Sequence, residues 1–369
     1  MINYDRSKVE IGILHFGLGG FHRAHQAVFA DLAIENGNYE LGIASISQRD
    51  PSLADEMSAA DSIYEVEASD GIKTDRRTIG AIKESLFYSR DEARILEIAR
   101  SPKLKAITLT VTEKAYKADS DFTFRLIKAL RARFEVGGSS IAVISCDNLP
   151  SNGDFIKNLL KEAVTDNGLW SWIESNVRFP NCMVDRIVPA PDKTNRLLIK
   201  TEIFNQWVIE HDPISQYFQG VGVQFVDEVK PYELAKIRLF NGVHSFLAYY
   251  GELAGIEYVA DVISIPSIYS YVKEMQENEI IKTLNLKIDL IAYASEIRGR
   301  MANVTLHHRC RQIAMDGSQK LPQRIIGTLN DLAALNLSAT HLVNVLNTWL
   351  KYLATSDAIN DPMGDKFKS

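Results

Sequence analysis

The segment from position 233 to 244 carries the side chains best suited to chemistry. Within it, Glu233, Lys236, Asn241 and His244 bring together a carboxylate, an amine, an amide and an imidazole. In a helix these residues would lie along one broad face, with apolar side chains between them. An ordinary core-facing stripe does not collect four polar groups, and an ordinary solvated face is less apolar.

Such a face suits the oxidation of an alcohol. Lys236 could accept the hydroxyl proton, because removal from water favours the neutral amine. The amide of Asn241 could stabilise the developing alkoxide, and His244 could orient a neighbouring hydroxyl. The segment has no second ligand cluster, so no metal site is predicted. From spacing alone, a surface face with an incidental ion pair between Glu233 and Lys236 explains the pattern equally well.

A second candidate site is a glycine-rich turn at the end of the first apolar run, formed by Gly17, Gly19, Gly20 and Phe21 and followed by His22. The first glycine would permit a tight turn, and Gly19 would let backbone N–H groups approach a pyrophosphate at a helix N-terminus. The third glycine of the usual motif is replaced by His22, so the motif is partial, and a purely structural turn is the alternative.

The end of the second apolar run, at Ser47–Asp50, would meet the adenosine ribose of a bound dinucleotide. An acidic residue there binds the ribose hydroxyls of NAD, whereas a basic residue accepts the 2′-phosphate of NADP. Arg49 and Asp50 have opposite charges. We therefore expect NAD through Asp50, with NADP left open and a solvated loop as the alternative.

The elements that position these residues change character along the chain. Strand-like runs alternate with helical segments at first, which predicts a largely parallel sheet covered on both faces. After Pro189 one extended stretch follows, at 200–209, and the rest is mostly helical. The expected fold class is α/β, a Rossmann-like dinucleotide-binding domain (1–190) followed by a mainly α-helical substrate domain (191–369). The expected strands are 9–16, 39–46, 106–111 and 140–145, and the main expected helices are 21–33, 119–134, 232–250, 269–276, 286–298 and 341–355.

Composition excludes several classes of protein. With 369 residues, 46% hydrophobic and 24% charged, the chain is neither disordered nor fibrous. No apolar run approaches the roughly 18 residues of a membrane helix, and the polar N-terminus predicts no signal peptide. A net charge of -6 disfavours nucleic acid as a partner. The three cysteines are widely separated and form no disulfide framework, which indicates a reducing, cytoplasmic setting.

Four separated motifs resemble the polyol-specific long-chain dehydrogenases, the family of mannitol 2-dehydrogenase, arabinitol dehydrogenase, fructuronate reductase and tagaturonate reductase. The resemblance covers nearly the whole chain in order, and the combination of motifs is highly specific. The motifs are GLGGFHRAHQ (17–26), SCDNLPSNG (145–153), MVDRIVP (183–189) and the K-x4-N-x2-H spacing from Lys236 to His244. The resemblance also accounts for His22, which is the family's own pattern at that position.

The resemblance implies roles for residues at matching positions. Lys236 would be the general base, with Asn241 and Asn148 as the oxyanion-stabilising pair. Asp185 and His244 would bind substrate hydroxyls. Asn148 could instead be a turn residue, and Asp185 could instead pair structurally with its neighbouring arginine.

Three further assignments are less direct. Gly17, Gly19 and Phe21 would form the dinucleotide turn. Glu233 would relay a proton or tune the lysine, with a plain salt bridge as the alternative. Arg311 would contact substrate, although the match there is uncertain by a few residues.

The expected function is metal-independent, reversible hydride transfer between NAD(P) and a secondary alcohol of an open-chain polyol or sugar acid. Mannitol/fructose and mannonate/fructuronate are the expected pairs. The alternatives are a non-catalytic dinucleotide-binding or regulatory protein and a metal-dependent alcohol dehydrogenase. The expected partner is a small molecule, without nucleic acid or membrane, and the chain is expected to be a monomer or weak homodimer. It is short for this family, and residues 364–369 are expected to form a frayed end.

Overall fold

The computed structural model describes residues 1–190, 192–355 and 360–364, so most of the expected frayed end lies outside the described residues. The chain divides into two compact units. Residues Met1–Ser69 and Thr74–Val229 form the first, which we call the α/β unit. Residues Asp70–Lys73 and Lys230–Ser369 form the second, which we call the helical unit.

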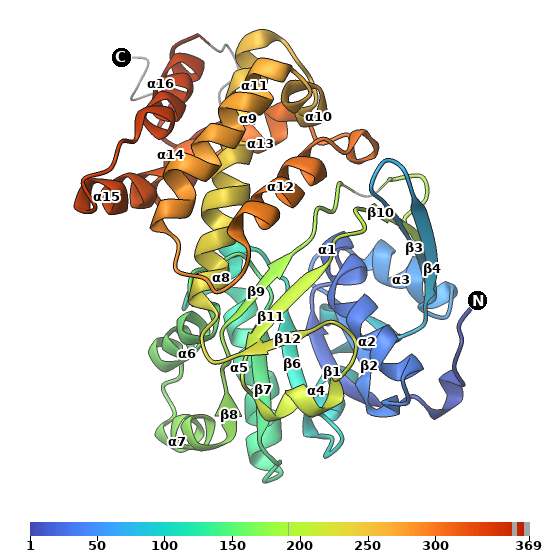
Figure 1. The fold of residues 1–369 in the computed structure, drawn as a ribbon. Helices are drawn as coiled ribbons and strands as arrows, with labels where there is room; N and C mark the ends of the chain where they lie inside the picture. Colours follow the sequence, from blue (N-terminus) through green and yellow to red (C-terminus); the bar gives the residue numbers. More distant parts are fainter. Residues whose placement is uncertain (191, 356–359, 365–369) are drawn as a thin grey trace. The chain divides into compact units, whose positions relative to one another are not determined.

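The α/β unit is built on a six-stranded sheet whose neighbouring strands are all parallel (Figure 1). The strand order is β5-β2-β1-β6-β7-β8, so the chain crosses over between non-adjacent strands. The expected Rossmann-like parallel sheet is therefore confirmed. The strands are β1 (Ile11–Phe16), β2 (Gly42–Ser47), β5 (Ile82–Phe87), β6 (Ala106–Leu109), β7 (Ile141–Ser145) and β8 (Val177–Arg178).

The sheet separates two hydrophobic cores. Ile13 of β1 belongs to one core and its neighbour Leu14 belongs to the other, because successive strand residues point to opposite faces. Ile43 and Ala44 of β2 divide in the same way. Both faces are buried, which explains why these strands are continuous apolar runs in the sequence.

Short helices cover the sheet, and several begin at a polar cap. Asp50, Ser120 and Asp166 each accept a backbone N–H from the first turn that follows. The expected helix 21–33 is two helices, because His25 leaves helical geometry at φ −120°, ψ −85°. The helices are α1 (Gly20–Ala24), α2 (Gln26–Glu35), α3 (Pro51–Ala59), α4 (Tyr88–Arg100), α5 (Asp121–Glu135), α6 (Asn152–Ala163) and α7 (Asn167–Asn176).

Two three-stranded sheets complete the α/β unit and extend it beyond the expected domain boundary. The expected boundary at residue 190 differs from the observed one at Val229. Residues beyond 190 pair with earlier strands, since β10 is parallel to β3 and β11 is antiparallel to β9. The strand orders are β10-β3-β4 and β12-β11-β9, with β3 (Tyr64–Ser69), β4 (Thr74–Ile79), β9 (Cys182–Asp185), β10 (Leu198–Thr201), β11 (Gln206–Glu210) and β12 (Gln224–Val226).

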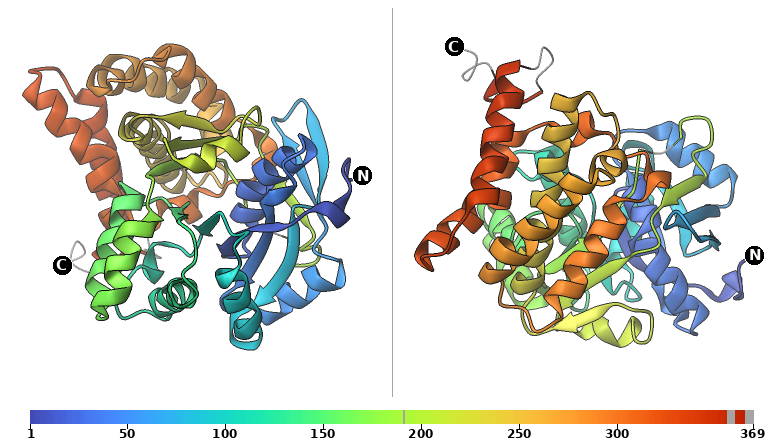
Figure 2. Two further views of the ribbon diagram at one scale, coloured as in Figure 1. Left: turned by 90° about the horizontal axis from the view of Figure 1, so that it is seen from below. Right: turned by 45° about the horizontal axis from the view of Figure 1, so that its top comes forward.

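The helical unit is confirmed as mainly helical (Figures 1 and 2, yellow to red). Helix α9 lies at its centre and packs against α10, α13 and α16. The α-helices are α8 (Lys230–Ala235), α9 (Val243–Ala254), α10 (Val259–Ile263), α11 (Pro266–Glu274), α12 (Leu290–Met301), α13 (Cys310–Ala314), α14 (Gly317–Leu321), α15 (Gly327–Ala334) and α16 (Thr340–Thr355).

Three segments of this unit are π-helical, with i→i+5 hydrogen bonding in place of the α-helical pattern. The expected helix 232–250 is helical over its whole length, but its middle, η5, is π-helical rather than α-helical. The segment η5 packs against both of the other π segments. The three are η5 (Lys236–Gly242), η6 (Met275–Ile280) and η9 (Pro322–Ile326).

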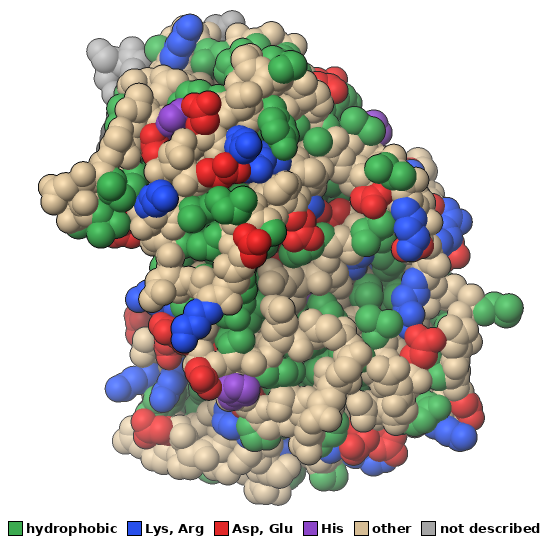
Figure 3. Space-filling model, in the orientation of Figure 1, with side chains coloured by type: hydrophobic (Ala, Val, Ile, Leu, Met, Phe, Trp, Pro, Cys, Tyr) green, Lys and Arg blue, Asp and Glu red, His purple; other side chains and the backbone are tan. Residues whose placement is uncertain are grey.

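The surface carries both charge signs. On the face seen in Figure 3, Lys and Arg side chains alternate with Asp and Glu, without an extended patch of one sign. Among the described residues, every helix is too short or too polar to cross a membrane. The three cysteines (Cys146, Cys182 and Cys310) are free and buried.

Candidate functional site

The glycine turn between β1 and α1 contains two glycines with different roles. Gly17 has φ +130°, and a Cβ there would lie 2.4 Å from both the backbone oxygen and the Oγ1 of Thr110. The position therefore admits only glycine. Gly19 is the N-cap residue of α1, and a Cβ there would meet no atom within 4 Å. The chain leaves open space at Gly19, where a ligand could approach the backbone and the helix N-terminus.

His22 occupies the position of the missing third glycine and is wholly buried. Its ring stacks on that of His15 at 3.4 Å, and its Nε2 lies 2.8 Å from Ser45 Oγ. Burial lowers the pKa of His22 to about 3, so the ring is neutral. The side chain packs α1 against β1 and β2.

Asp50, expected to bind the ribose, lies three residues beyond the end of β2 and is half-exposed. Its Oδ2 lies 2.6 Å from Arg196 Nη2, and its Oδ1 accepts bonds from Ser52 and the Leu53 amide. These hydrogen bonds, from Ser52 first, lower the pKa of the Asp50 carboxyl. Arg49 is exposed beside it. The Asp50 carboxylate thus caps α3 and pairs with Arg196, a residue that had no expected role.

Asp147, which follows β7, binds the segment that follows β6. It belongs to the second motif, but no role was expected for it. Its carboxylate accepts bonds from the Val111 amide at 2.8 Å, the Thr112 amide at 3.2 Å and the Tyr116 hydroxyl at 2.6 Å. Burial raises the pKa of this carboxyl and of the Tyr116 hydroxyl. Thr112 has φ +73°, a strained conformation that these bonds hold in place.

Asn148 follows directly and is exposed at the end of β7. The loop that carries it is held by Asn152, which is buried and bonds to the backbone of both neighbouring strands. Asn152 Nδ2 donates to Ser145 O and Cys182 O at 2.8 Å each, and its Oδ1 accepts the Cys182 amide at 2.9 Å. This amide fixes the spacing between the Asn148 loop and β9.

Asp185 is the last residue of β9 and is buried. Its neighbour Arg186 donates to the backbone oxygens of Ala24 and Glu202, and burial lowers the Arg186 pKa to about 10. The register pairs Asp185 with Gln206, whose backbone oxygen lies 2.8 Å from His25 Nε2. Within the α/β unit, the third motif is therefore connected through backbone groups to the helix pair that follows the glycine turn.

In the helical unit, the π segment η5 determines how the polar residues are arranged. In an α-helix, residues five apart are separated by about 140° around the axis, so Lys236 and Asn241 would face apart. The i→i+5 hydrogen bonding of a π-helix puts more residues into each turn, so residues five apart lie closer together around the axis than in an α-helix. The segment begins at Lys236 and contains Asn241. The π-helical backbone therefore suits the expected common face of these two residues better than an α-helix would.

Lys236 and His244 are both buried, at 7% and 6% exposure, whereas Glu233 in α8 is partly exposed. Burial, followed by the charges of His308, Arg324, Arg300 and Lys320, holds the His244 pKa well below its usual value. The His308 ring lies 4.7 Å from His244, and its own pKa is lowered to about 4 by burial. The imidazole of His244 is therefore neutral and able both to donate and to accept a hydrogen bond.

Arg311, expected to contact substrate, is exposed on α13. Its charge acts on the carboxyl of Glu252, which lies eight residues beyond His244 on α9. At 1.5 Å per residue this is about 12 Å along the helix. His308, three residues earlier in the chain, is the residue of this segment whose ring lies beside that of His244. The feature of the sequence that could have indicated this neighbour of His244 is the pair of adjacent histidines, His307 and His308.

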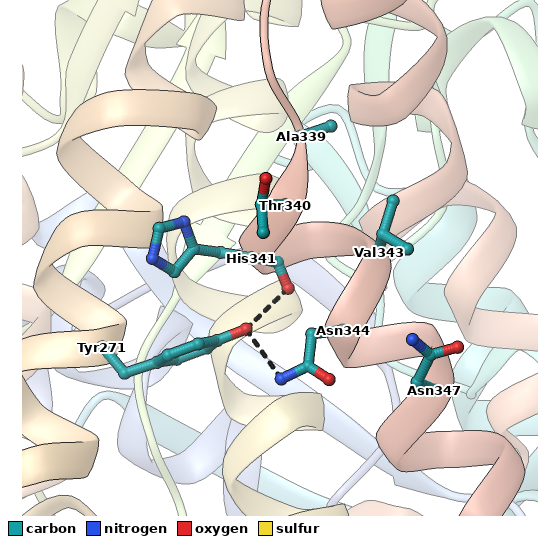
Figure 4. A pocket seen from close by; sticks show the side chains of 7 residues that line it. All are labelled: Tyr271, Ala339, Thr340, His341, Val343, Asn344 and Asn347. Atoms are coloured by element: carbon teal, nitrogen blue, oxygen red, sulfur yellow. Dashed lines mark hydrogen bonds between the residues drawn. The ribbon is translucent and has the colours of Figure 1, made fainter.

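A separate hollow of about 570 Å³ lies between α11 and α16 and includes none of the expected site residues (Figure 4). Tyr271 donates to the backbone oxygen of His341 at 2.8 Å and accepts from Asn344 at 3.2 Å across it. Among the residues that the structure describes, no three His, Cys, Asp or Glu side chains are arranged to hold a metal ion.

Comparisons with protein families give matches over both units. Residues 11–217 match the mannitol dehydrogenase Rossmann domain, and residues 228–369 match the mannitol dehydrogenase C-terminal domain. The chain is 35% identical to D-mannonate oxidoreductase of Escherichia coli, covering 99% of this chain and 86% of that protein. It is 31% identical to mannitol 2-dehydrogenase of Cereibacter sphaeroides, covering 96% and 84%.

The first of these alignments spans 417 positions, 48 more than the 369 residues of the chain. The bacterial relative therefore has at least 48 residues inside the matched span that lack a counterpart here. Part of the difference in length between the two proteins is therefore internal.

Solved structures agree with the sequence matches. Mannitol 2-dehydrogenase of Pseudomonas fluorescens, in a ternary complex with NAD and D-mannitol, has a TM-score of 0.86 and 28% identity. It covers 100% of this chain and 85% of its own. A D-sorbitol dehydrogenase in substrate-free form has a TM-score of 0.87 and 26% identity, covering 98% and 85%.

Proposed function

The chain belongs to the mannitol dehydrogenase family, as its four motifs predicted, and from this premise we propose that it catalyses NAD-dependent, reversible oxidation of a secondary alcohol. The substrate is an open-chain polyol or sugar acid of the mannitol or mannonate type. The observation that supports the proposal is the π-helical segment η5, which contains both Lys236 and Asn241 and directly precedes α9, the helix that carries the neutral imidazole of His244.

Each polar residue has a separate task in this reaction. Lys236 accepts the proton of the hydroxyl group that is oxidised, and its 7% exposure limits competition from water. Asn241 and Asn148 donate to the oxygen as negative charge develops on it. Asp185 and His244 bind other hydroxyls of the substrate. Glu233 lies one turn before Lys236 and passes the proton on to solvent.

The glycine turn fits the dinucleotide. Gly19 leaves space beside the N-terminus of α1, where backbone N–H groups suit a pyrophosphate. Asp50 faces the ribose hydroxyls, which favours NAD over NADP. NAD held at this turn would supply the acceptor for the hydride that leaves the carbinol carbon. The reaction requires no metal for the hydroxyl proton, because Lys236 takes it.

Steady-state rates with NAD and a panel of hexitols and hexonates test the proposal. We expect kcat/KM for D-mannitol or D-mannonate to exceed that for a simple primary alcohol by at least about 100-fold, since several hydroxyls are bound. A preference for a primary alcohol would refute the substrate class. Measurable NADH binding without turnover of any polyol would favour the non-catalytic alternative. Loss of activity with a chelator would favour the metal-dependent one.

A further inference from the structure

The amide of Gln276 connects η5 to a second π segment. Gln276 lies in η6, is wholly buried, and donates from Nε2 to the backbone oxygen of Leu239 at 3.0 Å. Leu239 lies between Lys236 and Asn241 within η5. The hydrogen bond therefore reaches the part of the backbone that sets the relative positions of the amine and the amide.

The orientation of Gln276 is itself fixed by Arg298 of α12. Arg298 Nη1 donates to Gln276 Oε1 at 2.8 Å, and Nη2 lies 3.2 Å from Glu277 Oε1. Arg298 is only 3% exposed, and its guanidinium lies 5.6 Å from the centre of the Tyr269 ring. Since a guanidinium only donates, it requires the oxygen of Gln276 to face it, and the amide N–H₂ group must then face Leu239.

A second carbonyl of η5 is held from the third π segment. Arg324 of η9 donates from Nη1 to Asn241 O at 3.4 Å and to Ser245 Oγ at 3.0 Å, and Ser245 Oγ donates to the same carbonyl at 3.1 Å. The two backbones approach closely, because a Cβ on Gly242 would lie 3.0 Å from Arg324 O. Side chains from η6 and η9 thus bind the η5 backbone on both sides of Phe240.

These contacts bear on catalysis because a π-helix is an uncommon conformation that the surrounding structure must maintain. If η5 reverted to α-helical geometry, Asn241 would rotate away from Lys236 by much of the about 140° that separates residues five apart. Displacements far smaller than this lower reaction rates substantially, because reacting groups must be held in register.

Resting on the proposed function, we propose that Gln276 is a positioning residue for the reaction: its amide holds η5 in the π-helical form that places Lys236 and Asn241 on one face. It touches neither substrate nor cofactor. Its removal lowers kcat while substrate and NADH binding change little.

The test replaces Gln276 in two ways and compares both with a control in the same segment. Gln276→Met removes the hydrogen bonds and retains the length of the side chain. Gln276→Glu retains an acceptor for Arg298 and, as a carboxylate, cannot donate to Leu239 O. The control is Glu279→Gln, because Glu279 is also in η6 and buried at 3% exposure, but accepts from the His341 and Leu342 amides of α16.

We expect both Gln276 variants to lower kcat by about 10- to 100-fold, with KM and the Kd for NADH changed less than about threefold. Their pH profiles for kcat should shift, because the base and the oxyanion donor no longer act together. Glu279→Gln should lower the melting temperature without moving the pH profile.

Wild-type kcat and an unchanged pH profile in a folded Gln276 variant would overturn the proposal. So would a loss of kcat in Glu279→Gln equal to that in the Gln276 variants. If Gln276→Met does not fold, Gln276→Glu decides, because it retains the bond to Arg298. A separate Lys236→Met variant with full activity would show that the proposed function fails, whatever Gln276 does.

Discussion

Replacing each glycine of the turn by alanine separates the residue that shapes the turn from the residue that receives the ligand. In Gly17→Ala the new Cβ lies 2.4 Å from Thr110 O, and the φ of +130° is strained for alanine. Backbone strain costs about 1–3 kcal/mol and overpacking costs a similar amount. We therefore expect a loss of at least about 2 kcal/mol in the free energy of unfolding, or a fall of about 4–8 °C in Tm.

Gly19→Ala should behave differently, because φ is −71° and no atom lies within 4 Å of the new Cβ. The change in stability should stay below about 1 kcal/mol, since no side-chain cap is lost. If the pyrophosphate lies against this backbone, the methyl group displaces it, and the Kd for NADH rises at least about tenfold, or 1.4 kcal/mol.

Thermal unfolding and titration of NADH fluorescence measure the two effects separately. A wild-type Kd in Gly19→Ala would refute the placement of the dinucleotide at this turn. An unchanged Tm in Gly17→Ala would refute the reasoning from the contact with Thr110. Both outcomes can be read without any turnover assay.

Three further changes have defined expectations. Asp50→Ser retains a cap for α3 and removes one of the two carboxylates that contact Arg196, so the ratio of kcat/KM with NAD to that with NADP should fall at least about tenfold; an unchanged ratio would contradict a role at the ribose. The pKa of His22 is depressed to about 3 in the folded protein, so only the unfolded state binds a proton as pH falls below about 6.5. From this residue alone, the free energy of unfolding should therefore drop by about 1.4 kcal/mol between pH 7.5 and 5.5. In urea titrations His22→Gln should lose that part of the pH dependence and retain the part due to His15; an identical slope would contradict the assignment. Asp147→Asn should lower the free energy of unfolding by about 1–3 kcal/mol, because an amide N–H₂ group then replaces one accepting oxygen and faces the Thr112 amide, or the Val111 amide and the Tyr116 hydroxyl. Unchanged urea stability would show that the carboxylate does not hold the loop.

The sequence predicted the four inner strands of the large sheet, but it missed the two edge strands, β5 and β8, and most of the smaller strands. Strands buried on both faces, such as β1 and β7, are continuous apolar runs. The glycine and polar residues that directly follow them indicate the end of the sheet where the candidate site residues were expected. The strand β4, TDRRTI, is mostly exposed and polar, so it has no such pattern. Its stability comes from antiparallel pairing with β3, a long-range contact that local composition does not encode.

The candidate site was predicted in its residue types and missed in its geometry. The spacing of five between Lys236 and Asn241 is unfavourable for a common α-helical face, and this was the only local sign of a π-helix. The hydrogen bonds that hold it come from Gln276 and Arg324, which are distant in sequence. Pairings between distant side chains depend on the folded unit, so one sequence could not supply them.

The central claim is that Lys236 is the general base, and single-turnover hydride transfer in Lys236→Met tests it most directly. The matched control is Lys230→Met, an exposed lysine at the start of α8, the helix that directly precedes η5. With enzyme in excess over NAD and a saturating polyol, NADH formation is followed at pH 7.5 and at higher pH. If Lys236 is the base, the rate of hydride transfer in Lys236→Met is about 10²–10⁴-fold lower than in the wild type and partly recovers as pH rises. The Kd for NADH and the rate in Lys230→Met stay unchanged. Hydride transfer at the wild-type rate in Lys236→Met would contradict this role of Lys236.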